Sequence, residues 1–175
     1  TNETFEVGFD FNYKDWLQLD LVYFNRNEVD AIIYDNTTFT YGNGSSDASG
    51  IELNTTVVPT SYLTINASYT YVNRDVFEDF NDYIPENKFV LGLDFTPFNN
   101  AFFNLSYRNV GERTIFDRYG SFGTAGEDVI LENYQVLDFM TNYKLLGDTV
   151  TLFAAVTNFL DEDYEDVFGY STRGR

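Results

Sequence analysis

The sequence of 175 residues contains no cysteine and no histidine, and Trp16 is its only tryptophan. Without cysteine, disulfide bonds, thiolate metal sites and thiol nucleophiles are all excluded. Without histidine, the usual general base of serine and cysteine hydrolases is missing as well. No other catalytic constellation is present in the sequence, which therefore predicts a protein that is not an enzyme.

Basic residues and long apolar runs are also scarce. The 10 Lys and Arg face 28 Asp and Glu, which gives a formal net charge of -18. Binding to a phosphate backbone depends on basic side chains, so nucleic acid is not expected as a partner. The longest apolar runs have strand length and fall short of the roughly 20 residues of a membrane helix. No signal peptide is visible at Thr1, so we expect a mature chain or a piece of a longer one.

The sequence does contain a repeated alternation of apolar and polar residues. In the first segment Phe5, Val7 and Phe9 alternate with polar residues such as Glu6 and Asp10. A period of two residues is typical of a β-strand, whose side chains point to opposite faces in turn. About ten residues tilted by about 45° cover on the order of 20 Å, close to the apolar band of an outer-membrane barrel. The pattern predicts eight strands of about this length, at 4–12, 16–25, 50–58, 63–72, 88–96, 101–108, 134–144 and 150–159.

The connections between these segments alternate between short and long. The connections 13–15, 59–62, 97–100 and 145–149 are tight, whereas 26–49, 73–87 and 109–133 are long and polar. Outer-membrane barrels show this asymmetry, with short periplasmic turns and long outside loops. Aromatic residues gather near strand ends, as in the belts at lipid headgroups, although they are also good strand formers. We therefore expect an all-β fold, an antiparallel transmembrane β-barrel with its polar face toward the lumen.

Two other architectures are compatible with parts of this pattern. Eight strands are enough for a small closed outer-membrane barrel. A soluble β-sandwich could instead bury the face that we assign to lipid. Another polar segment, 161–172, follows the eighth predicted strand and favours an arc of about eight strands from a larger barrel.

The stretch 152–175 is the most specific part of the sequence. It contains Asn158, Asp161 and Tyr164 in the run Asn-Phe-Leu-Asp-Glu-Asp-Tyr and ends in Gly174 and Arg175. This resembles the end of the barrel in TonB-dependent outer-membrane receptors, where Asn-Leu-(Leu/Phe)-Asp-x-x-Tyr precedes a loop ending in Gly-Arg. The resemblance implies a structural role for these five residues.

The Val-Phe-Gly-Tyr run at 167–170 is most similar to the vitamin B12 (cobalamin) transporters of that family. The chain departs from the family pattern at Phe159, where Leu is usual, and at Arg173, where the cobalamin transporters often have Pro. A fragment of about eight strands would then belong to a barrel of about 22 strands. The resemblance implies that residues 1–175 are its C-terminal portion, with the plug domain and the final strand absent from this sequence.

The resemblance also implies function and partners. It implies an active uptake receptor in the bacterial outer membrane, which binds a large, scarce substrate at its outside loops and lumen. Cobalamin is the favoured substrate, and a ferric siderophore or a small, non-transporting structural barrel are the alternatives. The implied partners are outer-membrane lipid, the substrate, TonB through the plug, and a surface lipoprotein.

Aromatic rings in the long connections are the candidates for substrate contact, because large rings provide binding area at little entropic cost. Packing of the loops against each other is the alternative role for these rings. Acidic runs lie at 75–82 and 161–166, but neither has the spacing of an EF-hand, so solvated charge is favoured over Ca²⁺ in the outside loops. No metal site or other cofactor is predicted. The substrate-contact candidates are Tyr34, Tyr41, Phe80, Tyr83, Phe116 and Tyr119.

Overall fold

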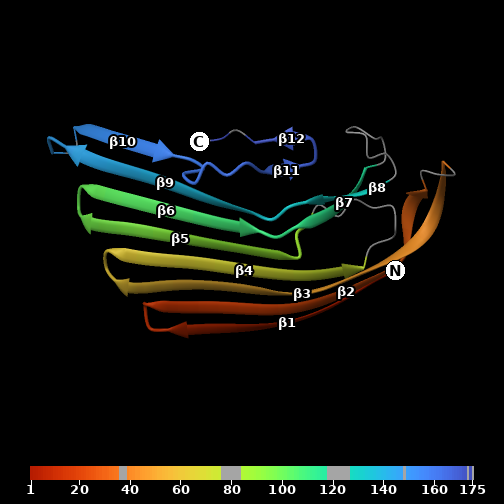
Figure 1. Cartoon of the computed structure of the whole chain (residues 1–175). Helices are drawn as coiled ribbons and strands as arrows, with labels where there is room; N and C mark the ends of the chain where they lie inside the picture. Colours follow the sequence, from red (N-terminus) through yellow and green to blue (C-terminus); the bar gives the residue numbers. More distant parts are fainter. Residues whose placement is uncertain (36–38, 76–83, 118–126, 148, 173, 175) are drawn as a thin grey trace.

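The computed structural model of the chain describes residues 1–35, 39–75, 84–117, 127–147, 149–172 and 174. In this part of the chain eight strands form one antiparallel sheet in the order β1-β2-β3-β4-β5-β6-β9-β10 (Figure 1). The strands of the sheet are β1 (Asn2–Tyr13), β2 (Leu17–Asp35), β3 (Thr40–Thr60), β4 (Leu63–Asp75), β5 (Asn87–Phe98), β6 (Ala101–Val110), β9 (Tyr134–Leu145) and β10 (Val150–Val156). Two short hairpins stand apart from it, β7 (Arg113–Asp117) with β8 (Glu127–Leu131) and β11 (Glu165–Val167) with β12 (Tyr170–Ser171).

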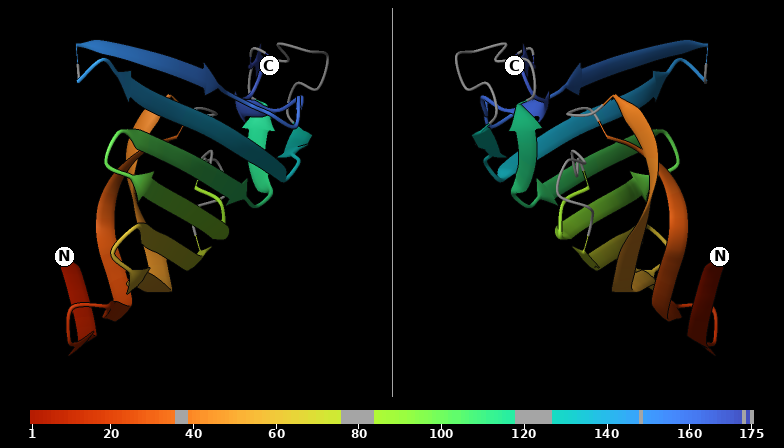
Figure 2. Two further views of the ribbon diagram at one scale, coloured as in Figure 1. Left: turned by 90° about the vertical axis from the view of Figure 1, so that its left-hand side faces the viewer. Right: turned by 90° about the vertical axis from the view of Figure 1, so that its right-hand side faces the viewer.

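The sheet is curved and twisted, with β1 at one edge and β10 at the other (Figure 2). All four short turns gather at one end of the sheet, here called the short-turn end (Figure 1). The longer connections and both extra hairpins lie toward the opposite end, the long-loop end. The four predicted tight connections are thus confirmed. None of the described segments forms a helix that is long and apolar enough to cross a membrane.

The register of the strands brings the apolar residues of neighbouring strands side by side. Phe9 pairs with Leu21, and Leu21 pairs in turn with Leu53. Farther along the sheet, Leu93 pairs with Leu105. Because side chains alternate between faces, these pairings place the apolar residues of all eight strands on one continuous face. Many of them are exposed in the chain by itself; Phe9 is 57% exposed. The sequence-based division into an apolar and a polar face is confirmed.

Strands β2 and β3 are much longer than the alternation predicts. The segment 26–49 is expected to be a loop, but β2 runs on to Asp35 and β3 begins at Thr40. The two extensions pair residue by residue, interrupted by a β-bulge between Glu28 and Ala31. The pattern of one apolar face fails here because both faces of an extension beyond the wall can contact water. Backbone pairing then forms the strand without an amphipathic sequence.

Three further expectations at the long-loop end need correction. The segment 109–133 is not simply a loop, because it contains the hairpin β7–β8. Strand β10 ends at Val156 and does not reach residue 159, since Asn158 adopts a positive φ of 51° that a strand cannot accommodate. The segment 161–172 contains the short hairpin β11–β12.

Aromatic rings pack against each other near both ends of the apolar face. At the short-turn end the rings of Tyr13 and Trp16 meet edge to face at 5.8 Å. At the long-loop end the Tyr69 hydroxyl donates a hydrogen bond to Asn87 Oδ1 at 2.6 Å. A ring with an apolar body and a polar partner suits the boundary between hydrocarbon and water. The assignment of these rings to headgroup belts stays a prediction.

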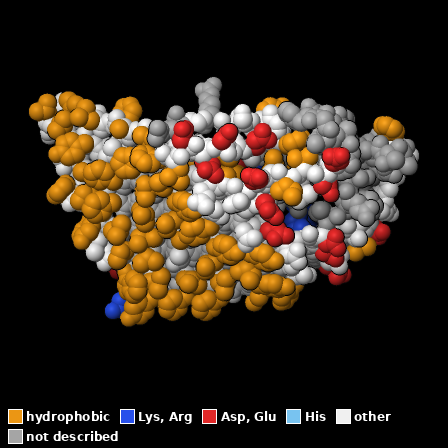
Figure 3. Space-filling view, viewed as in Figure 1, with side chains coloured by type: hydrophobic (Ala, Val, Ile, Leu, Met, Phe, Trp, Pro, Cys, Tyr) orange, Lys and Arg blue, Asp and Glu red, His pale blue; other side chains and the backbone are white. Residues whose placement is uncertain are grey.

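Buried side chains are concentrated at the long-loop end. Among the described residues Val110, Ile115, Leu131, Tyr134 and Val136 are at most 6% exposed, and all of them lie at this end. In Figure 3 the hydrophobic side chains cover much of the part nearer the short turns, whereas Asp and Glu gather nearer the long loops. The wall therefore exposes its apolar face, and the chain packs against itself mainly near the long loops.

Candidate functional site

The face opposite the apolar one is lined by polar side chains that bond to each other across strands. Thr56 Oγ1 donates to Asn66 Oδ1 at 2.9 Å, and Asn104 Nδ2 donates to Asp94 Oδ1 at 2.8 Å. Such groups are costly to bury without partners, so this face is suited to a water-filled space.

A groove of about 740 Å³ lies on this polar face over β1 to β4, close to the long-loop end. Its lining combines the apolar side chains of Val22 and Phe24 with charged ones such as Glu52. Phe24 lies against Gly50, because a Cβ atom at Gly50 would stand only 2.6 Å from Phe24 Cζ and 2.3 Å from the carbonyl oxygen of Tyr71. Glycine is therefore required under the ring, which provides a fixed aromatic surface in the groove.

A compact cluster of two arginines and two tyrosines occupies the polar face where β6 meets β9. The rings of Tyr134 and Tyr164 stack at a centroid distance of 4.2 Å. Arg108 Nη2 donates to the Tyr164 hydroxyl at 3.3 Å, and the Arg108 and Arg113 guanidinium carbons lie 5.7 and 5.6 Å from the Tyr134 ring centroid. The Tyr134 hydroxyl donates to Asp166 Oδ1. Cation–π contacts and hydrogen bonds together fix this end of the sheet.

The segment 158–172, here called the strap, begins with a tight turn at Asn158. The Asn158 amide donates to Asp138 Oδ1 at 2.8 Å, and its side chain makes two hydrogen bonds with the backbone of Glu162, at 2.8 and 3.0 Å. Asn158 is 5% exposed, and its positive φ belongs to a region that Asn tolerates better than most residues. The side chain therefore replaces strand pairing at the point where β10 ends.

The strap ends close to where it begins. The Thr172 amide donates to the carbonyl of Tyr164 at 3.1 Å. A Cβ atom at Gly174 would lie 3.1 Å from Asp161 Oδ1, so the small residue lets the backbone approach this carboxylate. The structure thus brings Asn158, Asp161, Tyr164 and Gly174 into one folded unit, whereas Arg175 lies outside the described residues.

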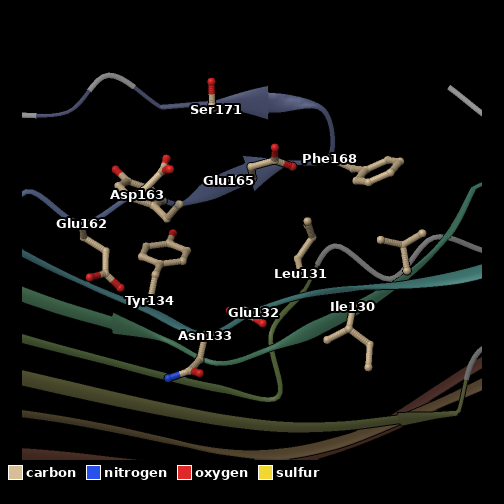
Figure 4. A pocket seen from close by; sticks show the side chains of 12 residues that line it. Ile130, Leu131, Glu132, Asn133, Tyr134, Glu162, Asp163, Glu165, Phe168 and Ser171 are labelled. Carbon is tan, nitrogen blue, oxygen red and sulfur yellow. The ribbon is translucent and has the colours of Figure 1, made fainter. Parts of the chain in front are cut away.

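A cavity of about 370 Å³ separates the strap from the β8–β9 connection (Figure 4). Tyr134 and Leu131 line it from one side, and Glu165 and Phe168 from the strap. Carboxylates also contribute to the lining, among them Asp163. The strap therefore packs on the wall at Tyr164, which stacks on Tyr134, and leaves this cavity beside that contact.

The predicted substrate-contact residues are distributed over several segments. Tyr41 lies on the β3 extension and is 77% exposed. The backbone of Tyr34 pairs with Tyr41 in the same hairpin, and that of Phe116 pairs with Asp128 in β7–β8. The side chains of Tyr34 and Phe116 lie outside the described part of the chain, as do the whole of Phe80, Tyr83 and Tyr119.

Arg113 lies at the centre of the long-loop end, and the many acidic residues of the sequence favour an internal salt bridge for it over pairing with an anionic substrate. Arg113 is buried, with 5% of its side chain exposed, and its guanidinium contacts the strap. The sequence does not indicate its partners, because these contacts lie 52 and 53 residues away. Among the described residues there is no group of three or more acidic side chains placed to hold a metal ion.

Comparison with known structures finds the same arrangement in larger proteins. The ferripyoverdine receptor of the outer membrane of Pseudomonas aeruginosa matches 96% of this chain and 24% of its own, at 19% identity and a TM-score of 0.77. The FrpB iron transporter from Neisseria meningitidis matches 93% of this chain and 27% of its own, at 21% identity and a TM-score of 0.69. The siderophore receptor PirA from Acinetobacter baumannii matches 93% of this chain and 28% of its own, at 14% identity and a TM-score of 0.72.

The chain spans about a quarter of the length of these structures. Its sequence also matches the family described as TonB dependent receptor-like, beta-barrel, over residues 1–159. The sheet with one apolar and one polar face, its short and long connections and this family match all indicate the wall of a membrane β-barrel. The chain belongs to the TonB-dependent receptor family and forms part of the wall of its β-barrel in the bacterial outer membrane.

Proposed function

We propose that this chain is part of a receptor that takes up an iron chelate across the outer membrane. The observation that carries the proposal is the two-faced wall: an apolar face for lipid and, behind it, a polar face with a groove of about 740 Å³. The proteins with similar structures are named as a ferripyoverdine receptor, an iron transporter and a siderophore receptor, which supports a chelate as substrate. The proposed role is transport and not catalysis, with TonB as the partner that supplies energy.

Within this proposal, the chelate contacts the groove and the exposed hairpin β2–β3. The fixed ring of Phe24 offers an aromatic surface in the groove, and Tyr41 offers another on the hairpin. Aromatic rings bury a large area for few frozen rotors, so they are efficient contacts for a bulky ligand.

Cobalamin is a second candidate, favoured by the Val-Phe-Gly-Tyr run at 167–170 in the strap. Gly169 in this run has a φ of 81°, a backbone conformation that residues other than glycine rarely adopt. The same sequence can therefore serve the turn between β11 and β12. For this reason we place the iron chelate first.

Titration of the intact receptor decides between these ligands. Purified receptor in detergent is titrated with ferric pyoverdine, a ferric catecholate and cyanocobalamin, with tryptophan fluorescence and calorimetry as readouts. Saturable binding of a ferric chelate supports the first proposal, and binding of cyanocobalamin alone would replace it with the second. If none of the three binds, uptake of these substrates is refuted.

A variant of one ring tests where the ligand lies. Replacing Tyr41 with Ala removes an exposed ring, and we expect weaker binding of the chelate by roughly 5- to 150-fold, the range for loss of about 1 to 3 kcal/mol per base-sized stacking contact. Tyr41→Phe keeps the ring and serves as the matched control. Equal affinities for Tyr41→Ala and the parent protein would exclude this ring from the site.

A further inference from the structure

The strap lies on the lumen side of the wall. Arg108, Tyr134 and Asp138 all belong to the polar face, and each of them contacts the strap. Since the opposite face is the apolar one, the strap extends into the space that the barrel encloses. It therefore narrows the lumen near its outer mouth.

Arg113 ties the strap to a different element of the mouth, the hairpin β7–β8. Its Nη1 donates to the carbonyl of Asp166 at 3.0 Å and its Nη2 to the carbonyl of Glu165 at 2.9 Å. The Asp166 carboxylate lies 3.9 Å from Nη1 and also accepts a hydrogen bond from the hydroxyl of Tyr134. A guanidinium group presents several donors in a fixed fork, and here the fork joins two segments far apart in the sequence.

The strap also contacts the wall through Tyr134, which donates its hydroxyl to Asp166 and stacks on Tyr164, but its hairpin is short. Strand β11 has three residues and β12 has two, and isolated two-stranded hairpins are marginal in water. The cavity of about 370 Å³ leaves space beside the strap. Within the described residues the Nε atoms of Arg108 and Arg113 are buried without an acceptor, which weakens the closed arrangement.

We propose that Arg113 is a latch that holds the strap, residues 158–172, across the lumen as a lid. While its hydrogen bonds to Glu165 and Asp166 persist, the hairpins β7–β8 and β11–β12 move as one body. When they break, the β11–β12 hairpin is released and swings away from the wall about the Asn158 turn. The Asp166 side chain is half exposed, so this contact can be reached from the aqueous side.

The role of the lid in uptake rests on the proposed function, but the latch itself can be tested without a ligand. Because the chain contains no cysteine, Ser171→Cys on the strap and Asn99→Cys at the β5–β6 turn introduce two unique thiols. The intact receptor, with any cysteine outside this chain replaced, is spin-labelled at these thiols and reconstituted in lipid vesicles. Pulsed electron paramagnetic resonance then gives the distribution of distances between strap and wall.

Arg113→Met keeps the apolar stem of the side chain and removes its donors. We expect a narrow distribution in the parent protein and a broadened distribution with an additional component in Arg113→Met. Arg26→Met is the matched control, because Arg26 is an exposed arginine with one ion pair to Glu28 at 3.6 Å. It should reproduce the parent distribution, and an equal broadening in Arg26→Met would overturn the proposal.

Arg113→Lys keeps the charge but not the fork, and it decides the question if Arg113→Met fails to fold. A broadened distribution in Arg113→Lys supports the latch. A parental distribution in every Arg113 variant that folds overturns it. These measurements contain no substrate, so a receptor that shows the latch but binds no ferric chelate would refute the proposed function alone.

Discussion

Lysine substitutions on the two faces of the sheet test directly which face contacts lipid. Leu91 lies on the apolar face of β5, between Ala67 of β4 and Tyr107 of β6. Strand β5 has 12 residues, Asn87–Phe98, so Leu91 is about one and a half positions from its middle. At ~3.3 Å per residue and a tilt of about 45°, the offset from the centre of the band is about 3 to 4 Å.

A lysine at this depth on the lipid face is expected to cost about 2 to 4 kcal/mol of folding free energy. This corresponds to a roughly 30- to 900-fold change in the folding equilibrium constant. Asn104→Lys is the matched control on the polar face, where the new ammonium group replaces the Asn104 donor to Asp94 at 2.8 Å. Its cost is expected to be about 1 kcal/mol or less.

The assay is urea-dependent folding of the intact receptor into lipid vesicles, carried out in parallel for the parent and both variants. Unfolding free energies are compared between proteins that share the same m-value, the slope of free energy against urea concentration. A changed m-value would mean that the unfolding transition itself had changed. Equal costs for Leu91→Lys and Asn104→Lys, or a larger cost for Asn104→Lys, would refute the assignment of faces.

Two further substitutions test how the wall and the strap are held. Gly50→Ala forces a Cβ atom against Phe24 and should cost about 1 to 3 kcal/mol of folding free energy. In the control Gly92→Ala, the new Cβ would meet nothing closer than 3.9 Å, and the change should be about 0.5 kcal/mol or less. Thermal unfolding in vesicles compares the two variants. Asn158→Ala loses two hydrogen bonds to Glu162 and should cost about 1 to 3 kcal/mol, and Asn158→Gly, which tolerates the positive φ, should cost less. Equal losses of stability in Gly50→Ala and Gly92→Ala would contradict the first prediction. Parental melting temperatures in both Asn158 variants would contradict the second.

The faces of the sheet could be predicted because they depend on a local period of two residues. Once Phe9 and Leu21 are placed on one face, antiparallel pairing extends that face from strand to strand. The strand extensions around Tyr41 could not be predicted in the same way. Both of their faces are free to contact water, so no apolar period marks them.

The candidate site was less accessible to sequence reasoning than the fold. Asn158 could be recognised through a family motif, since the hydrogen bonds of its side chain reach only to Glu162, four residues away. An internal salt bridge at Arg113 could be expected from the acidic composition, but its partners Glu165 and Asp166 could not, because they lie 52 and 53 residues away and are brought near by the arrangement of the sheet. Contacts that depend on the complete sheet leave no pattern in a short window of sequence.

The distribution of buried side chains has a consequence for where the stability of this protein originates. The apolar face of the wall is left uncovered by the described chain, whereas buried residues such as Ile115 and Tyr134 gather beside the strap. The hydrocarbon of the membrane therefore acts as the missing half of the core, and its thickness sets how well the strands are solvated. A change in bilayer thickness therefore alters the stability contributed by every strand of the sheet at once. The long-loop end, whose packing involves protein alone, does not depend on it in this way.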